Sequence, residues 1–319
     1  MSRDEQSIIE RFFRHLGAVR TDVVLGIGDD AALLRAPRGC DLVQTTDALV
    51  EQVHFLPGSP PRSLGHRALA INLSDLAAMG ASPAWALLSL TLPQVDEAWL
   101  GEFAAGFGVL ARSHGVALVG GNLSRGPLSM TVQLTGQAPA GTALRRSGAQ
   151  AGDELWVSGT LGDASFGRTL RPGAGAGSQV DWLRARFEYP TPRIALGEAL
   201  RGVASACIDL SDGLLADLPR LAAASQCGAQ LDVEQLPISD ALRAQAGELA
   251  WQHGLAGGED YELCLAVPPA RAAVLEALAA GLAVPLSRCG QLQRAPGLEL
   301  RRRAAVIQFS QSPFDHFAP

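Results

Sequence analysis

The chain has 319 residues, of which 47% are hydrophobic and 18% are charged. That length predicts two domains, and the apolar content is sufficient for a sizeable core. The formal net charge of −6 gives no indication of a nucleic-acid surface. All 26 basic residues are arginine. The absence of lysine excludes a P-loop, a protein-kinase site and Schiff-base chemistry, each of which depends on a lysine amine.

The remaining composition indicates a reduced, cytoplasmic protein. Five widely spaced cysteines form no Cys-x-x-Cys pair, and the six histidines show no zinc-binding spacing. The N-terminus has no signal-peptide core, and no apolar run reaches membrane-spanning length. We therefore expect a cytoplasmic protein that binds neither membranes nor nucleic acid.

Helices and strands alternate in the first part of the chain. Apolar periodicity predicts helices over 4–16, 63–79 and 97–113, and strands over 31–34, 41–47, 85–92, 116–119 and 128–137. The strand from Val116 is expected to end in a turn at Gly120-Gly121, where bared backbone N–H groups can cradle phosphate. The Gly/Pro/Ala/Thr stretch over 138–143 predicts a boundary between domains of residues 1–140 and 141–319.

The second part of the chain is also mixed. Strands are predicted over 153–159, 206–209 and 263–267, and helices from about residue 161, over 181–187, over 193–201 and up to residue 224. The Gly/Ala-rich stretch over 171–178 predicts a flexible loop.

Acidic residues recur at the predicted element ends of the first domain. Asp29 and Asp30 are adjacent within Gly26-Ile-Gly-Asp-Asp-Ala-Ala32, which is either a polar turn or a cation site. Asp47 follows the hydroxyls of Thr45 and Thr46 at a strand end. Asp75 lies among apolar helix neighbours, so it is either exposed on the far face or buried with a partner.

Two further acidic segments lie in the second domain. Asp209-Leu-Ser-Asp-Gly213 connects a strand to a helix, and an N-cap explains one of its side-chain oxygens but not three. Glu259 and Asp260 follow Gly257-Gly258 before another strand. If the acidic segments converge, they form a cage for divalent cations, which favours metal-assisted phosphoryl transfer.

Six motifs in order resemble those of the thiamine-monophosphate kinase family. They are Gly26–Ala32, Thr45–Asp47, Asn72–Gly80, Val157–Ala164, Asp209–Gly213 and Gly257–Leu263. The family belongs to the aminoimidazole-ribonucleotide-synthetase-like ATP-binding superfamily. The resemblance implies an α+β, two-domain PurM-like fold, in which the N-terminal domain binds ATP and Mg²⁺ and pairs in a homodimer. The C-terminal α+β domain would complete the active-site cleft.

The resemblance also implies roles for individual residues. Mg²⁺ ligands are expected at Asp30, Thr45, Thr46, Asp47, Asp75, Asn122, Asp209 and Asp212. ATP contacts are expected at Asp30, Thr45, Gly121, Arg146 and Ser211. Thiamine monophosphate is expected to contact His54, Asp260 and Phe314, where an acid and an aromatic face suit the thiazolium cation.

One position departs from the family pattern. After Gly120-Gly121 the family usually has a metal-binding aspartate, and this chain has Asn122. The amide keeps an oxygen ligand and loses the charge. This implies weaker metal binding there, a slow enzyme or a variant metal set.

The expected activity is ATP-dependent phosphorylation of thiamine monophosphate to thiamine diphosphate, with several Mg²⁺ ions. An alternative is another member of the superfamily with a different acceptor. Selenophosphate synthetases fit less well, since they use an N-terminal Cys or selenocysteine and a lysine. A third alternative is a non-catalytic, nucleotide-binding homologue.

Overall fold

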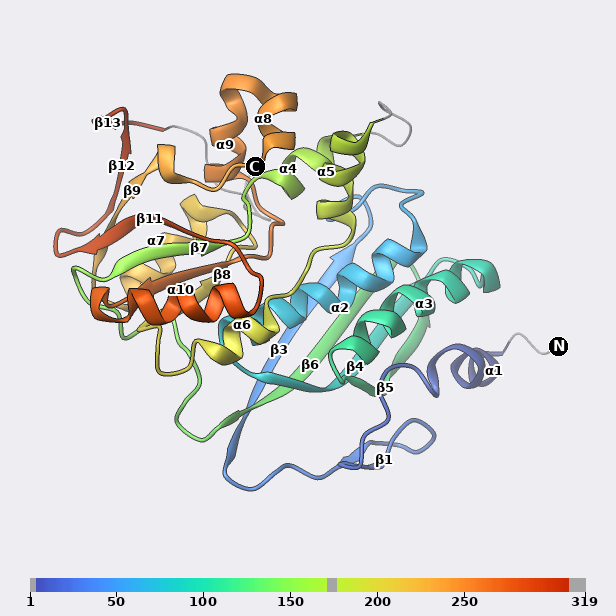
Figure 1. Ribbon diagram of the computed structural model, residues 1–319. Helices are drawn as coiled ribbons and strands as arrows, with labels where there is room; N and C mark the ends of the chain where they lie inside the picture. The colour runs from blue at the N-terminus through green and yellow to red at the C-terminus, as the bar shows by residue number, and fades with distance from the viewer. Residues whose placement is uncertain (1–3, 171–176, 310–319) are drawn as a thin grey trace. The chain divides into compact units, whose positions relative to one another are not determined.

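The structure is a computed structural model that describes residues 4–170 and 177–309. The chain divides into two compact units. The first is formed by Met1–Leu76 and Ala81–Gly141, and the second by Ala77–Gly80 and Thr142–Pro319. Each unit is built around its own main sheet (Figure 1).

A four-stranded sheet forms the framework of the first unit. Its order is β3 (Cys40–Val50), β6 (Ser129–Pro139), β4 (Ser82–Leu92) and β5 (Ala117–Arg125). The pairs β3–β6 and β6–β4 are antiparallel, and β4–β5 is parallel. A short antiparallel hairpin, β1 (Val23–Leu25) with β2 (Leu33–Leu34), precedes the sheet in the chain.

Two long helices, α2 (Pro61–Ala78) and α3 (Glu97–Ser113), cover one face of this sheet (Figure 1). A Cβ added to Gly65 would lie 2.1 Å from the Phe103 carbonyl oxygen, and one added to Gly106 would lie 1.9 Å from the Arg62 oxygen. The two helices therefore pack with their backbones in contact. The N-terminal segment forms a short helix α1 (Glu5–Ile8) that continues as a π-helical turn, Ile9–Phe13.

The other face of the first sheet is only partly covered, by the β1–β2 hairpin, whose Val23 and Leu34 pack against the buried Trp85 and Ala117. Strand alternation sends Leu49 toward the helices, where it is 2% exposed, whereas Leu42 is 47% exposed on the opposite face. Leu87 of β4 lies on the same outer face and is 40% exposed. The first unit thus buries one face of its sheet and leaves apolar side chains on the other.

A seven-stranded sheet forms the centre of the second unit. Its order is β13 (Ala305–Ile307), β12 (Leu298–Arg302), β9 (Gly228–Asp232), β11 (Leu286–Gln293), β7 (Glu154–Ser158), β10 (Leu263–Val267) and β8 (Ala206–Asp209). All pairs are antiparallel except β12 with β9. Strand β10, buried along its whole length, lies between β7 and β8.

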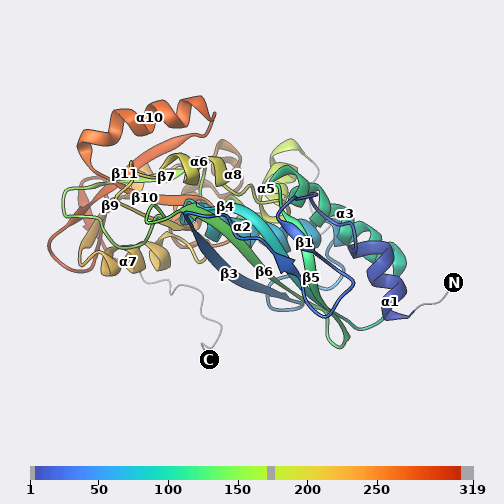
Figure 2. The ribbon, with the colours of Figure 1, turned by 90° about the horizontal axis from the view of Figure 1, so that it is seen from below.

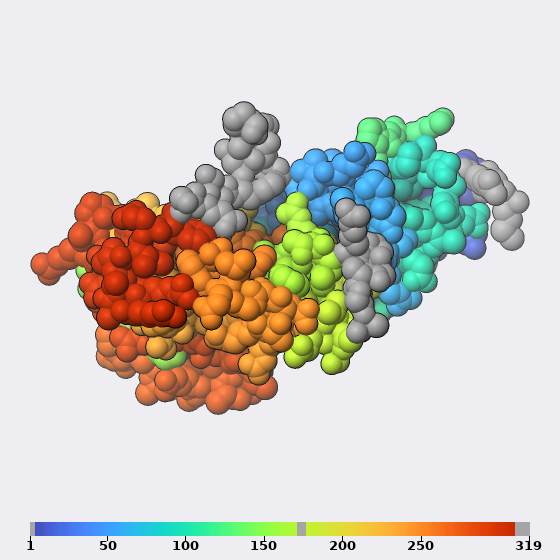
Figure 3. Space-filling view, turned by 90° about the horizontal axis from the view of Figure 1, so that it is seen from above, coloured from blue at the N-terminus to red at the C-terminus, as the bar shows by residue number. Residues whose placement is uncertain are grey.

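Helices cover both faces of this second sheet. Figure 2 shows α10 (Ala272–Gly281) on one face and α7 (Leu214–Ala224) on the other. The unit also contains five shorter helices: α4 (Asp163–Thr169), α5 (Ser178–Glu188), α6 (Ile194–Ala199), α8 (Asp240–Ala246) and α9 (Ala250–Ala256). Helices α8 and α9 reach the surface, where they are orange in Figure 3.

Most predicted elements are confirmed. Helix α3 and strand β10 have the predicted bounds, and the helix predicted over 4–16 is shorter, since it changes to the π form at Ile9. Of the loop predicted over 171–178, residues 171–176 lie outside the described residues. No helix among the described residues is long and apolar enough to span a membrane.

Candidate active site

The first acidic segment lies on the turn between β1 and β2. Asp29 and Asp30 are both exposed there, and the Asp30 backbone N–H donates to Asp29 Oδ1 at 2.9 Å. Gly28 has φ +125°, and an added Cβ would lie 3.2 Å from both terminal guanidinium nitrogens of Arg14. The turn therefore requires glycine at position 28 and presents two adjacent carboxylates to solvent.

Predicted ligands from β3 and α2 come together on the helix-covered face of the first sheet. The Thr45 hydroxyl donates to Asp75 Oδ2 on α2. Asp47 is two residues further along β3 and shares the face of Thr45 and of the buried Leu49. The sequence left open whether Asp75 is exposed on the far face of its helix or buried with a partner. In the structure this carboxylate is partly buried against the sheet and has the Thr45 hydroxyl as its partner.

Two other predicted ligands have side chains on the opposite face. Thr46 alternates with Thr45, and its hydroxyl donates to the Val132 carbonyl oxygen at 3.2 Å. Asn122 is exposed and lies opposite Ser89 of β4 in the register. The side chains of Thr46 and Asn122 therefore lie on one face of the sheet, and those of Thr45 and Asp47 lie on the other.

The prediction of a turn at Gly120-Gly121 is wrong, because β5 continues through both glycines to Arg125. A Cβ added to Gly121 would lie 1.8 Å from the Leu88 carbonyl oxygen of β4. Glycine is thus needed for the close approach of the two strands, and its N–H groups are not bared by a turn.

His54 lies on the turn that follows β3. Its Nδ1 atom accepts a hydrogen bond from the Val50 backbone N–H at 3.0 Å, and the Arg67 guanidinium lies 3.4 Å from its carbonyl oxygen. The Val50 contact requires Nδ1 to be unprotonated, so the neutral ring carries its proton on Nε2.

In the second unit, the Asp209–Asp212 segment connects β8 to α7. Asp209 is 4% exposed, whereas Asp212 is only partly buried. Arg220 Nη1 donates to Asp212 Oδ2 and to Asp217 Oδ1, both at 2.7 Å. Burial, followed by the charge of Asp212, raises the pKa of the Asp217 carboxyl to about 6. The acidic segment thus already holds a cationic group.

The 257–262 segment runs alongside this loop as an extension of the β8–β10 pair. The Glu259 N–H donates to the Ser211 oxygen at 2.8 Å, and the Tyr261 N–H donates to the Leu210 oxygen at 2.9 Å. The Leu210 N–H donates in return to the Glu262 oxygen at 2.8 Å. Two of the predicted acidic motifs therefore form one backbone ladder.

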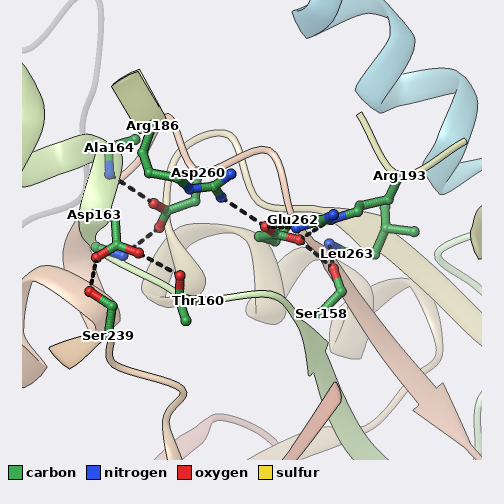
Figure 4. A network of polar contacts seen from close by, with 11 residues as sticks. Ser158, Thr160, Asp163, Ala164, Arg186, Arg193, Ser239, Asp260, Glu262 and Leu263 are labelled. Atoms are coloured by element: carbon green, nitrogen blue, oxygen red, sulfur yellow. Dashed lines mark hydrogen bonds and ion pairs between the residues drawn. The ribbon is translucent and has the colours of Figure 1, made fainter. Parts of the chain in front are cut away.

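Asp260 is 2% exposed, and its carboxylate accepts the Gly162 N–H at 2.7 Å and the Ala164 N–H at 3.3 Å (Figure 4). Its pKa is raised well above the ordinary range, mainly by burial. Nearby, Asp163 accepts from Thr160 Oγ1 at 2.5 Å and Ser239 Oγ at 2.6 Å, and burial raises its pKa as well. Both carboxylates thus order the loop between β7 and α4.

Glu262 accepts more hydrogen bonds than the other carboxylates labelled in Figure 4, and it is fully buried. Arg193 donates to both carboxylate oxygens at 2.6 Å, and Arg186 donates to Oε1 at 2.8 Å. Ser158 Oγ, at the end of β7, donates to Oε2 at 2.7 Å. This one carboxylate connects the α5–α6 region to two central strands.

The last predicted residues contribute less. Arg146 is exposed, and its carbonyl oxygen accepts from Ser225 Oγ at 2.9 Å. Phe314 lies outside the described residues. Within 4–170 and 177–309, no three His, Cys, Asp or Glu side chains are grouped closely enough to hold a metal ion by themselves.

Two family models cover most of the chain. The model of the AIR synthase related protein, N-terminal domain, matches residues 28–138, and that of the C-terminal domain matches residues 150–303. The thiamine-monophosphate kinase of Salmonella typhimurium is 46% identical over 325 residues, which is 100% of this chain and 99% of that protein. The chain belongs to the thiamine-monophosphate kinase family.

Solved structures of thiamine-monophosphate kinases share the fold. The enzyme from Stenotrophomonas maltophilia K279a is 45% identical, with a TM-score of 0.85 over 94% of this chain and 96% of that one. AaThiL complexed with AMPPCP and TMP is 31% identical, with a TM-score of 0.78 over 91% of this chain and 92% of that one. The resemblance and the α+β fold expected from the sequence are confirmed.

The sequence-based interpretation of this kinase-family site missed three groups: Asp217, Arg220 and the partners of Glu262. A signal for Asp217 was present, because an aspartate among the leucines of α7 is costly to bury without a partner. Glu262 could have been suspected from its place directly before a buried strand. Its arginine partners had no local signal, because they come from distant helical segments.

Proposed function

We propose that this chain transfers the γ-phosphoryl group of ATP to thiamine monophosphate, forming thiamine diphosphate and ADP. The observation that carries the proposal is the full-length identity of 46% to a thiamine-monophosphate kinase. The complex of a 31% identical relative with AMPPCP and TMP supports the same pair of ligands. The acidic segments within β3 and at the end of β8 supply the chemistry that this transfer needs.

The acceptor in this reaction needs no general base. A phosphate monoester has a second pKa of about 6, so its attacking oxygen is already ionised near neutral pH. The barrier instead comes from the approach of two anions, and it is lowered by alignment and by positive charge near the transferring group. The lack of lysine in the chain leaves that charge to arginine and to bound cations.

The predicted ligands fit Mg²⁺ by donor type, since carboxylate, hydroxyl and amide oxygens are hard donors. The proposed set is Asp30, Thr45, Thr46, Asp47, Asp75, Asn122, Asp209 and Asp212. The contact of Thr45 with Asp75 places two such oxygens together, and Arg220 on Asp212 indicates that this carboxylate accepts a cation. Bound Mg²⁺ would neutralise phosphate charge. Thr46 would contribute most easily through its carbonyl oxygen, because its hydroxyl faces the other side of the sheet.

The remaining roles concern the two substrates. Asp30, Thr45, Gly121, Arg146 and Ser211 are proposed to contact ATP, and His54, Asp260 and Phe314 are proposed to contact thiamine monophosphate. Asp260 binds backbone N–H groups with both of its oxygens, which favours an action on the substrate through the 160–164 loop.

We also propose that the first unit forms a homodimer through the outer face of its sheet. Leu42 and Leu87 are 47% and 40% exposed on that face, and a second copy would cover both. Neighbouring Thr46 and Ser89 would form its polar part. An acidic protein of this kind is proposed to be cytoplasmic and to bind neither membranes nor nucleic acid.

An acceptor panel tests the activity and separates the alternatives. Release of ADP would be followed with thiamine monophosphate, with thiamine and with an unrelated phosphomonoester, each at several Mg²⁺ concentrations. Turnover with thiamine monophosphate alone is expected. Turnover only with another acceptor would support a different member of the superfamily. ATP binding by calorimetry without turnover on any acceptor would support a non-catalytic homologue.

A further inference from the structure

We propose that Glu262 is a positioning residue, which holds the 257–261 segment and, through it, the Asp209–Asp212 loop in the geometry that phosphoryl transfer requires. The inference rests on the proposed kinase function of that loop. It concerns a side chain that is fully buried and has no direct access to ATP or thiamine monophosphate.

The first step is the backbone contact between the two segments. Hydrogen bonds join Glu259 to Ser211 and Tyr261 to Leu210. A Cβ added to Gly258 would lie 2.5 Å from the Ser211 carbonyl oxygen, and one added to Gly213 would lie 2.7 Å from the Gly257 oxygen. No side chain separates the segments, so a displacement of one is passed directly to the other.

The second step is the conformation of the 257–261 segment. Glu259 has φ +72° and Tyr261 has φ +52°, and both are residues other than glycine in the left-handed region. Such residues keep this conformation only where their surroundings enforce it. The segment beside the Asp209–Asp212 loop is therefore strained and depends on anchors at its end.

The third step is the identity of those anchors. Asp260 and Glu262 lie on either side of Tyr261, and both carboxylates are buried. Asp260 is held by two neutral N–H groups, whereas Glu262 is held by two guanidinium groups and a hydroxyl (Figure 4). A two-point guanidinium–carboxylate contact is stronger and more specific in geometry than bonds from uncharged N–H groups, so Glu262 is the firmer anchor.

A role in stability alone explains this arrangement poorly. A buried ion pair adds little net stability over a well-packed apolar group of similar size, because both charges lose their hydration. A fixed geometry, by contrast, does require directional bonds from several sides. Ser158 adds to it, since its hydroxyl donates to Glu262 and accepts the Leu263 N–H at 2.9 Å.

The test compares Glu262→Gln with a matched control, Asp153→Asn. Asp153 is a buried carboxylate directly before β7, whereas Ser158 is at the other end of that strand. The Asp153 carboxylate accepts hydrogen bonds from Ser205 Oγ at 2.6 Å and from the Gln150 N–H at 3.0 Å. Two readouts are needed: kcat for thiamine diphosphate formation, and amide hydrogen exchange of the ligand-free protein over residues 255–262. The exchange measurement does not depend on activity.

Glu262→Gln is expected to lower kcat about 100-fold, the order seen when reacting groups are displaced by about 1 Å. Exchange over 255–262 is expected to accelerate at least about tenfold, since the Glu259 and Tyr261 N–H groups lose their fixed partners. Asp153→Asn is expected to leave both readouts within about twofold of the unsubstituted chain, even if its melting temperature falls equally.

Either of two results would overturn the proposal: a kcat of Glu262→Gln equal to that of Asp153→Asn, or unchanged exchange over 255–262. If Glu262→Gln does not fold, Arg186→Gln is measured by the same two criteria, because Arg193 still pairs with Glu262 in that variant. If the unsubstituted chain forms no thiamine diphosphate, the proposed function fails, and the exchange comparison still decides whether Glu262 holds the segment.

Discussion

Adding one methyl group at Gly258 is expected to displace the Asp209–Asp212 loop. In Gly258→Ala the new Cβ would lie 2.5 Å from the Ser211 carbonyl oxygen and 3.2 Å from the Asp212 carbonyl carbon. Both neighbours are backbone atoms, so no flexible side chain can rotate away. Ordinary contacts begin at 3.4 Å, and 3.4 − 2.5 leaves 0.9 Å to be gained by separation of the two segments.

The size of the effect follows from that distance. A displacement of about 1 Å among groups that align a reaction lowers its rate on the order of 100-fold, so kcat is expected to fall by about that factor. Overpacking costs roughly 1–3 kcal/mol of folding free energy, and the lower unfolded-state entropy of alanine returns about 0.4–1 kcal/mol. The net loss of stability is therefore expected to be about 1–2 kcal/mol.

The assay is a coupled measurement of ADP release, with urea denaturation of the same preparation. Gly281→Ala is the control, because among the described residues nothing outside its chain neighbours and its own helix backbone lies within 4 Å of a Cβ at the end of α10. It is expected to keep its kcat and to gain up to about 1 kcal/mol from the higher helix propensity of alanine. A Gly258→Ala protein with kcat within about twofold of the unsubstituted chain would refute the reasoning.

Four further outcomes are expected. Asn122→Asp lowers the Mg²⁺ concentration for half-maximal activity at saturating ATP, because a carboxylate binds Mg²⁺ more tightly than an amide; an unchanged or higher value refutes this. Arg220→Gln tightens Mg²⁺ binding in calorimetry without substrates, since the guanidinium no longer competes for Asp212. Leu87→Asp yields monomers in light scattering, because a charge is placed on the outer sheet face. Burial raises the pKa of Asp163 in the native state, so between the unfolded and native pKa values the native state binds more protons than the unfolded chain. The free energy of unfolding therefore falls as the pH rises through that range. Asp163→Asn is expected to remove this fall.

Three of these outcomes have a control or a matched comparison. Arg288→Gln removes an arginine that pairs with Glu154 at 3.2 Å, remote in sequence from the acidic loops, and is expected to leave Mg²⁺ binding unchanged. Val109→Asp alters a 57% exposed residue of α3 and is expected to leave the assembly unchanged. For Asp163→Asn, urea denaturation at pH 4 and pH 7 is compared, and an equal change for both proteins contradicts the assignment.

Sequence periodicity was sufficient for most elements of the first unit, whereas β9, β11, β12, β13, α8, α9 and α10 of the second unit were not predicted. The apolar positions of α3 repeat with the helical period because one side of that helix packs on the sheet, so its bounds could be read directly. The motif at Gly120-Gly121 gave a wrong prediction of a turn, because a turn and a close contact between strands both require the absence of a Cβ. Only the neighbouring strand, with its Leu88 oxygen, distinguishes the two.

The site was harder to predict than the fold because its contacts are distant in the chain. Glu262 binds Arg193 and Ser158 across 69 and 104 residues, and nothing in the local sequence identifies those partners. Asp260 shows the converse: its acidic motif is obvious, but its binding to backbone N–H groups depends on where the 160–164 loop lies. Acidic motifs thus indicated the chemistry, and tertiary structure assigned each carboxylate its partner.

The central claim is direct phosphoryl transfer from ATP to thiamine monophosphate, and γ-labelled ATP tests it most directly. The purified chain would be incubated with [γ-³²P]ATP, Mg²⁺ and thiamine monophosphate, and the products separated by chromatography. We predict that the label appears in thiamine diphosphate in a one-to-one ratio with ADP, and that Asp212→Asn abolishes the transfer while the protein remains folded. Label found only in inorganic phosphate, or retained in ATP, would contradict the claim.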